Sequence, residues 1–233
     1  MRITYYGHSC FLVEVGGQKL LFDPFITANP RNASNSIDIS SIHPDYILLS
    51  HGHADHVADV EVIADQSGAQ IIGVAEVVSW YEEKGFKGMG MNTGGRRKFD
   101  FGTLKMVSAV HSSSFPDGSY AGNPVGFVIS NEFSGTFYFA GDTALTYDMK
   151  LIPQLCPRLD FAILPIGDHF TMGYEDAIIA SNFVQCNTII GCHFDTFESI
   201  RIDHSAAKKA FSQANKTLFL PEIGMSFNIK KKT

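Results

Sequence analysis

The sequence lacks the features that would place the protein in a membrane or on the secretory route. None of its apolar runs approaches the ~18 residues that a membrane-spanning helix needs. The N-terminal stretch MRITYYGHSCFLVEV alternates like a β-strand, and it has neither the long apolar core nor the small-residue cleavage site of a signal peptide. We therefore expect no association with a membrane.

Cysteine is scarce, and its four occurrences form no CxxC pair: Cys10, Cys156, Cys186 and Cys192. The simplest interpretation is four free thiols in a reducing cytoplasm, so we expect a cytoplasmic protein. Cys192 directly precedes His193, but for this cysteine we predict a place in the core rather than metal ligation.

An excess of basic residues is also missing. The net charge is −6, the sequence pI is about 5.8, and the C-terminal basic run Lys230–Lys232 lies in a predicted solvated tail. A protein that binds nucleic acid usually presents a basic surface. We therefore expect a small-molecule substrate and no nucleic-acid partner, while the sequence leaves formation of a homo-oligomer open.

No low-complexity segment, short-period repeat or Pro/Ser-rich linker divides the chain, so we predict a single domain over residues 1–233. That length, with 45% hydrophobic and 18% charged residues, is sufficient for a sizeable core.

The pattern of apolar residues predicts the same plan in both halves of the chain. In the first half, strand-like runs turning at Gly16-Gly17 precede a polar loop from about Asn29 to His43, and strands then alternate with helices. In the second half, hairpins such as the one about Gly102 again precede strand–helix alternation, with Asp203 as a candidate N-cap. This repetition predicts an α/β fold of two pseudo-symmetric halves: a four-layered αββα sandwich whose two sheets pack face to face between helices.

The most informative segment is ILLSHGHADHVADV, which brings His51, His53, Asp55 and His56 together directly after an apolar run. Unpartnered polar groups beside a core are costly, and metal coordination accounts for all four at once. Residues two apart in an extended loop point the same way. His51 and His53 can therefore bind one metal while Asp55 and His56 turn toward a second, with small residues between them that let the loop fold tightly.

Other candidate ligands also follow apolar strands: His111 after LKMVSAV, Asp142 after TFYFAG, His169 after AILPIGD and His193 after TIIGC. Functional groups in β/α arrangements collect where strands end. A single histidine at such a place is more often a hydrogen-bonded structural residue than a ligand. Nevertheless, His111 and His193 are natural completions of two sites, and Asp142 can bridge them through its two oxygens.

This set of residue types predicts hydrolytic metal chemistry. Zinc prefers imidazole nitrogen and carboxylate oxygen, and a catalytic site leaves one position for water. Two divalent ions ~3.5–4 Å apart hold a water between them and lower its pKa to about 7, which yields a hydroxide nucleophile at neutral pH.

HGHADH resembles the HxHxDH signature of the metallo-β-lactamase superfamily, and His111, Asp142 in AGDT and His193 follow in that superfamily's order. The resemblance covers essentially the whole chain and agrees with the αββα plan. The chain is most similar to the small prokaryotic metal-dependent hydrolases, distantly related to L-ascorbate-6-phosphate lactonases. The stretches that carry this similarity are YYGHSCF, FDPFITANP, LLSHGHADHV, AGDTAL, LPIGDHFTMGYEDA and HFDTF.

The resemblance implies a dinuclear hydrolase that usually holds zinc, with manganese, iron or nickel as alternatives. The implied ligands fall into three groups: His51, His53 and His111 for the first metal, Asp55, His56 and His193 for the second, and Asp142 as the bridge. Members with Asp at the bridging place tend to hydrolyse phosphoesters, thioesters or lactones, whereas true β-lactamases usually carry Cys there. The HxHxDH loop also argues against the flavodiiron oxidoreductases of this fold.

Beside the metals, the candidate catalytic residues are Asp55, His8 and His169. The family also has a histidine at the place of His8, which we expect at the edge of the site as a proton donor or as a partner of a ligand. His169 stands where close relatives are expected to carry Asn, and we expect it to face the cleft. Asp23, in FDP, could orient a ligand histidine, and Asp168 could do the same.

Two other segments bear on the site. Phe194 and Asp195 in HFDTF stand where relatives tend to carry Tyr and Asn, which would alter the rim near the second metal. The loop 111–124 is rich in Ser, Gly and Pro, and it is either a substrate-covering loop or a plain surface loop. His43 and His204 are predicted to be surface or capping residues.

These observations predict a metal-dependent hydrolase in which a hydroxide bridging two metals attacks an ester, lactone, thioester or phosphoester. His8 or His169 would assist the leaving group. One alternative is a nuclease or phosphodiesterase acting on RNA, which the acidic charge balance disfavours. Another is a non-catalytic metal-binding protein, which is disfavoured because structural zinc sites are usually closed by four ligands.

Overall fold

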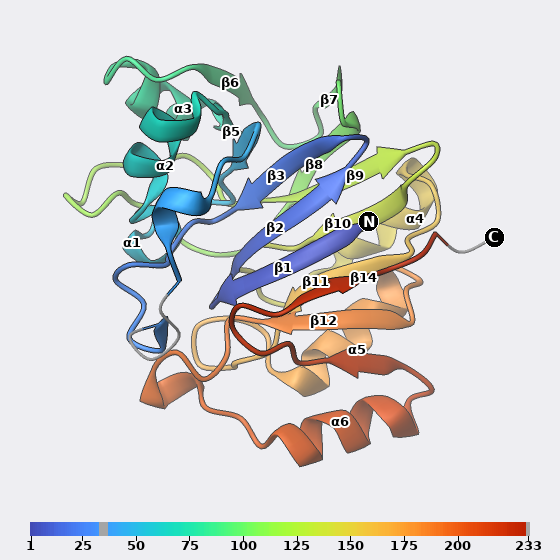
Figure 1. Ribbon diagram of the computed structural model, residues 1–233. Helices are drawn as coiled ribbons and strands as arrows, with labels where there is room; N and C mark the ends of the chain where they lie inside the picture. Colours follow the sequence, from blue (N-terminus) through green and yellow to red (C-terminus); the bar gives the residue numbers. More distant parts are fainter. Residues whose placement is uncertain (33–36, 232–233) are drawn as a thin grey trace.

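The computed structural model describes residues 1–32 and 37–231. Residues 33–36 of the predicted polar loop and Lys232 of the basic run lie outside the described residues. Two seven-stranded sheets form the centre of the molecule, and helices lie on their outer faces (Figure 1). This arrangement confirms the predicted αββα sandwich.

The first sheet has the strand order β14-β1-β2-β3-β4-β5-β6. Its strands are β1 (Arg2–Gly7), β2 (Cys10–Val15), β3 (Gln18–Phe22), β4 (Tyr46–Leu48), β5 (Gln70–Val74), β6 (Gly88–Met91) and β14 (Ser226–Asn228). Neighbours are antiparallel from β14 to β3 and parallel from β3 to β6.

The second sheet repeats this plan in the order β13-β12-β11-β10-β9-β8-β7. Its strands are β7 (Arg96–Phe99), β8 (Gly102–Ser108), β9 (Val125–Asn131), β10 (Gly135–Phe139), β11 (Phe161–Pro165), β12 (Thr188–Cys192) and β13 (Thr217–Phe219). Neighbours are antiparallel from β7 to β10 and parallel from β10 to β13. The two halves therefore share one topology, as the repeated apolar pattern predicts, except that the C-terminal β14 crosses back to pair with β1.

Helices cover the outer face of each sheet (Figure 1). Beside the first sheet lie α1 (Ala54–Val57), α2 (Val60–Ser67), α3 (Ala75–Glu82) and the 3₁₀ helix η2 (Ile39–Ser41). Beside the second lie α4 (Ile152–Leu155), α5 (Tyr174–Phe183), α6 (His204–Gln213) and the 3₁₀ helices η3 (Tyr147–Leu151) and η4 (Glu198–Ile200). Within the described ranges, no helix is long and apolar enough to cross a membrane.

Three apolar clusters hold the four layers together. One fills the space between the sheets and includes Phe22, Phe127 and Cys192, which confirms Cys192 as a core residue. The other two lie between each sheet and its helices. Leu48 of β4 contributes to the central cluster while Ile47 contributes to an outer one, because successive strand residues face opposite sides. All four cysteines are free thiols, as predicted.

The local signals in the sequence correspond to observed turns and caps. Gly68 ends α2 in the left-handed conformation, and the Asp203 carboxylate caps the N-terminus of α6. The helical stretch after the histidine cluster is divided into α1 and α2 near Asp59. The Asp59 carboxylate accepts hydrogen bonds from the backbone N–H groups of Ile26 and Thr27, which ties this break to the loop after β3.

Candidate metal centre

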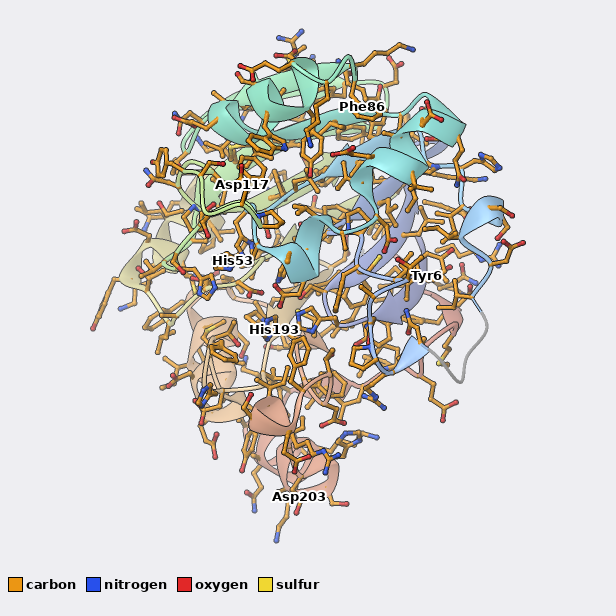
Figure 2. The ribbon with its side chains drawn as sticks, turned by 90° about the vertical axis from the view of Figure 1, so that its left-hand side faces the viewer. Tyr6, His53, Phe86, Asp117, His193 and Asp203 are labelled. Atoms are coloured by element: carbon orange, nitrogen blue, oxygen red, sulfur yellow. The ribbon has the colours of Figure 1, made fainter. Side chains whose placement is uncertain are left out.

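The predicted ligands come together at one end of the two sheets. Figure 2 shows His53 from the first half and His193 from the second near the middle of the same face. The residue that directly follows a strand often turns toward this end in the left-handed conformation: His8 after β1 has φ 54°, Asp23 after β3 has φ 43°, and His193 after β12 has φ 52°. The His193 N–H also donates to the His8 carbonyl at 3.0 Å, which joins the two halves at the site.

His51, His53 and His111 form the first group. One ring nitrogen from each lies within 4.8 Å of the others. His51 Nε2 is 2.9 Å from His53 Nδ1, and the His111 ring lies 5.2 Å, centroid to centroid, from each of the other two. Burial, and then the neighbouring His56, lower the pKa of His51 well below its usual value, which keeps its ring neutral. A neutral imidazole is the form that binds a metal.

Asp55, His56 and His193 form the second group, together with His8. Asp55 Oδ2 lies 3.9 Å from Nε2 of both His56 and His193. Burial would raise the pKa of Asp55, but His56 and the hydrogen bond from His8 outweigh it and hold that pKa well below its usual range. Asp55 is therefore an ionised carboxylate facing two imidazole nitrogens.

Asp142 lies between the two groups. Its Oδ2 is 3.0 Å from His193 Nε2 and 3.3 Å from His56 Nε2. The same oxygen is 3.6 Å from His111 Nε2 and 4.0 Å from His51 Nε2. The Asp142 carboxylate is thus surrounded by four imidazoles drawn from both groups.

Several buried polar atoms of this cluster have no hydrogen-bond partner among the described residues: His56 Nε2, His193 Nδ1 and Asp142 Oδ1. Buried polar groups are almost always partnered, so an unpartnered set indicates a ligand. Imidazole and carboxylate together suit a divalent cation such as zinc. The residues present therefore fit metal ions in both groups.

Asp23 orients one histidine of each group, His56 directly and His51 through Ser50. It is fully buried, its Oδ1 accepts from the Ser50 N–H at 2.8 Å, and its Oδ2 accepts from His56 Nδ1 at 2.8 Å and from the Ser50 hydroxyl at 2.6 Å. Because the Ser50 proton goes to Asp23, the Ser50 oxygen accepts from His51 Nδ1 at 2.9 Å. His51 is thereby left with an unprotonated Nε2 that faces the cluster, and His56 points its Nε2 the same way. Burial lowers the pKa of His56, but Asp142 and Asp23 outweigh it and raise that pKa well above its usual value, so a metal ion at this nitrogen would displace a proton.

His8 contacts Asp55 and does not line the open cleft. Its side chain is buried, its Nε2 lies 3.0 Å from Asp55 Oδ2, and its Nδ1 lies 2.9 Å from the Thr196 hydroxyl. Burial, and then His193, lower the pKa of His8 to about 4, so the ring is neutral near pH 7. Because a carboxylate only accepts, His8 Nε2–H donates to Asp55 and Thr196 donates to Nδ1. This geometry favours the role of ligand partner over that of proton donor.

The structure does not bring Asp168 or His169 into the cluster. Both are exposed with positive φ, at 58° and 55°, and neither lines the cleft above the ligands. The His169 ring instead packs against Phe170, with the centroids 4.4 Å apart. His43 is exposed, and His204 is an exposed first residue of α6, as predicted for both.

A cleft of about 760 Å³ opens over the cluster. Five predicted ligands line it: His53, Asp55, His111, Asp142 and His193. The rest of the lining is a mostly apolar wall that the sequence patterns left unassigned, formed by Phe25, Ala28, Ala54, Ala58, Ser112, Phe170, Phe197 and Ser199. One feature of the sequence could have identified the phenylalanines of this wall: each stands in a loop after a strand that is also followed by a predicted site residue.

The loop 111–124 packs against the HxHxDH loop. Phe115 and Ala121 are buried in the outer cluster of the first sheet, and Ser112 lines the cleft. A Cβ placed on Gly52 would lie 2.4 Å from the Ala121 Cβ and 3.2 Å from the Ser114 carbonyl oxygen. The small residue at position 52 therefore serves close packing between two ligand-bearing loops, in agreement with the predicted spacer role.

Gly52→Ala should displace one of these loops and weaken both stability and metal binding. Overpacking of this kind costs about 1–3 kcal/mol. We expect a lower melting temperature and weaker zinc binding by titration calorimetry. Ala121→Gly in the same chain should recover most of the loss, because it removes the methyl group that Gly52→Ala meets. A double variant no better than Gly52→Ala would show that this contact is not the cause.

Two mixed sheets between helices, with a His/Asp cluster at their shared end, define a metallo-β-lactamase-type hydrolase. The family model described as "Beta-lactamase superfamily domain" matches residues 2–193, and the chain belongs to this superfamily. A metal-dependent hydrolase of Flavobacterium johnsoniae is 56% identical over 229 residues, which cover 98% of this chain and all of that protein. We class the chain with the metal-dependent hydrolases of the superfamily.

Solved structures agree with this classification. Igni18, a metallo hydrolase from the archaeon Ignicoccus hospitalis, has a TM-score of 0.84 and 31% identity, covering 98% of this chain and 99% of its own. The isothiocyanate hydrolase from Delia radicum gut bacteria has a TM-score of 0.77 over the full length of both chains. At 18% identity, the second likeness shows a shared fold only.

Proposed function

We propose that the protein is a dinuclear hydrolase that binds two divalent metal ions, zinc in the first instance. His51, His53 and His111 would hold one ion, Asp55, His56 and His193 the other, and Asp142 would contact both. The observation that carries this proposal is the position of Asp142 Oδ2, within 3.0–4.0 Å of four imidazole nitrogens from both groups.

Two bound divalent cations supply the activation of water and the stabilisation of the negative charge that develops on the attacked group. The ligands account for how the chain can prepare such a site. Asp23 and Ser50 hold His51 and His56 in the tautomer whose Nε2 can coordinate, and His8 holds Asp55 by a hydrogen bond. The cleft leaves the cluster open on the side of His53 and His111, which are only partly buried. An ester, thioester, lactone or phosphoester could reach the cluster from there.

Removal and return of metal tests this proposal. After dialysis against a chelator, the protein should hydrolyse no member of a panel of p-nitrophenyl esters, thioesters, lactones and phosphoesters. Addition of zinc or manganese should restore hydrolysis of at least one of them. A fully metal-loaded protein that is inert toward the whole panel would favour a non-catalytic metal-binding role instead.

A further inference from the structure

We infer that the cleft selects neutral carbonyl substrates with an apolar arm, namely carboxylic esters, thioesters or lactones, rather than phosphoesters or RNA. This inference rests on the proposed hydrolase function and concerns the wall of the cleft rather than its metals.

The first observation is the absence of cations around the cluster. The chain has 18 lysine and arginine residues, but none of the described residues that line the cleft is among them. The arginines of the adjoining segments are directed to carboxylates, with Arg31 3.6 Å from Asp195 and Arg201 2.9 Å from Glu198. Beyond the ligand histidines and carboxylates, the polar groups in the lining are the hydroxyls of Ser112 and Ser199.

Basic residues do gather elsewhere, in a separate groove lined by Arg96, Arg97, Lys98 and Lys105. They stand on β7 and β8, whereas the cleft is lined by other segments. A phosphomonoester carries about −1.5 to −2 charges on several acceptor oxygens. In the cleft, any phosphoryl oxygen or nucleotide phosphate beyond the cluster would lose water without gaining a cation, which is unfavourable.

The second observation is an apolar wall that begins at the cluster itself. Phe25 and Phe197 both set their rings against His8, with centroids 5.5 and 5.7 Å from its ring. Phe170 completes the wall from the loop between β11 and α5. Phe170 and Phe197 are 53% and 36% exposed and line the same cleft, so both present apolar ring surface to whatever occupies it.

These features suit a substrate whose reacting group requires no polar contact beyond those that the His/Asp cluster provides. A carbonyl group presents a single oxygen on which charge develops, and the rest of an ester can be apolar. An alkyl or aryl arm lying on Phe170 and Phe197 would remove their exposed faces and its own from water, a favourable exchange. The wall would therefore act as the specificity determinant, while the ligands perform the reaction.

The test uses zinc-loaded protein and one leaving group throughout. The substrates are p-nitrophenyl acetate, butyrate, hexanoate and octanoate, with bis(p-nitrophenyl) phosphate as the anionic counterpart. We expect kcat/KM to rise at least about tenfold from acetate to hexanoate, since a fully buried methylene is worth about fourfold. Phe170→Ala with Phe197→Ala should raise KM for hexanoate about tenfold and leave acetate nearly unchanged. The matched control is Phe133→Ala, because Phe133 is 85% exposed and lies outside the cleft lining.

A binding measurement on metal-free protein separates the wall from catalysis. The neutral probe N-phenyl-1-naphthylamine should bind wild-type and Phe133→Ala protein equally. It should bind the Phe170→Ala/Phe197→Ala variant at least about tenfold more weakly, as expected for lost aromatic contact area.

The outcomes are distinguishable. Three outcomes would overturn the inference but not the proposed hydrolase function. They are a kcat/KM that does not depend on acyl chain length, probe binding that is unchanged in the double variant, and a larger kcat/KM for the phosphodiester than for the hexanoate ester. If the fully metal-loaded wild-type protein turned over none of these substrates, the proposed function itself would be overturned.

Discussion

Asp142→Ala should abolish both activity and stable metal binding. Among the carboxylates of the described residues, only this one has ion-pair contacts within 4.0 Å to imidazole nitrogens of both groups, so its loss would remove a ligand from each proposed site. Loss of metal-based charge stabilisation is worth several kcal/mol, so we expect kcat to fall by about 10³-fold or more. Metal analysis should show less than one bound ion per chain after gel filtration.

The matched control is Asp203→Asn. This change also removes one carboxylate, but Asn is as good an N-cap as Asp, and Asp203 lies at the start of α6 rather than in the cleft. We expect wild-type metal content, activity and melting temperature. An Asp142→Ala protein that keeps two metals and full activity would contradict the assignment of the bridging ligand.

Asp23→Asn should weaken both proposed metal sites although Asp23 is not one of the proposed ligands. If the amide oxygen stays on the Ser50 N–H, the NH₂ group meets His56 Nδ1–H, and two donors face each other. The His56 ring then favours the other tautomer and presents Nε2–H to the cluster, which cannot coordinate. Mutation of such orienting partners typically costs about 10–100-fold in metal affinity or activity.

The tautomer change provides a readout that a merely destabilised protein would not show. In ¹⁵N NMR of metal-free protein, both ring nitrogens of His56 should be protonated in the wild type, because Asp142 and Asp23 raise its pKa well above the usual value despite its burial. In Asp23→Asn the ring should carry its proton on Nε2 alone. Ser50→Ala is the partial control, because it removes the link to His51 but leaves the 2.8 Å contact from His56 to Asp23. Wild-type metal affinity in Asp23→Asn would exclude the orienting role.

The residues of the His/Asp cluster were predictable because their signals are local. The HxHxDH loop follows β4 directly, and Asp142 and His193 each follow an apolar strand. Parallel strands deliver their ends to one edge of a sheet, so strand ends identify the site without knowledge of the packing. The central position of Asp142 between four histidines needed the pairing of the two sheets, which no local pattern specifies.

Other features depend on tertiary contacts that the sequence does not display. β6 has the sequence GMGM, a poor strand former, and it owes its conformation to pairing with β5. His169 follows a strand like the residues of the cluster, yet the turn after β11 exposes it and directs Phe170 to the cleft instead. Phe197 joins the same wall from a separate loop. A strand end is thus a necessary signal for a site residue here, but not a sufficient one.

Metal stoichiometry in paired ligand variants tests the dinuclear site most directly. Wild-type protein purified without chelator should contain two divalent ions per chain by inductively coupled plasma mass spectrometry. His53→Ala removes a ligand of the first group only, and His193→Ala removes one of the second group only. We expect each variant to retain about one ion per chain. One ion or none in the zinc-saturated wild type, or loss of the same ion in both variants, would contradict a site built from two metal groups.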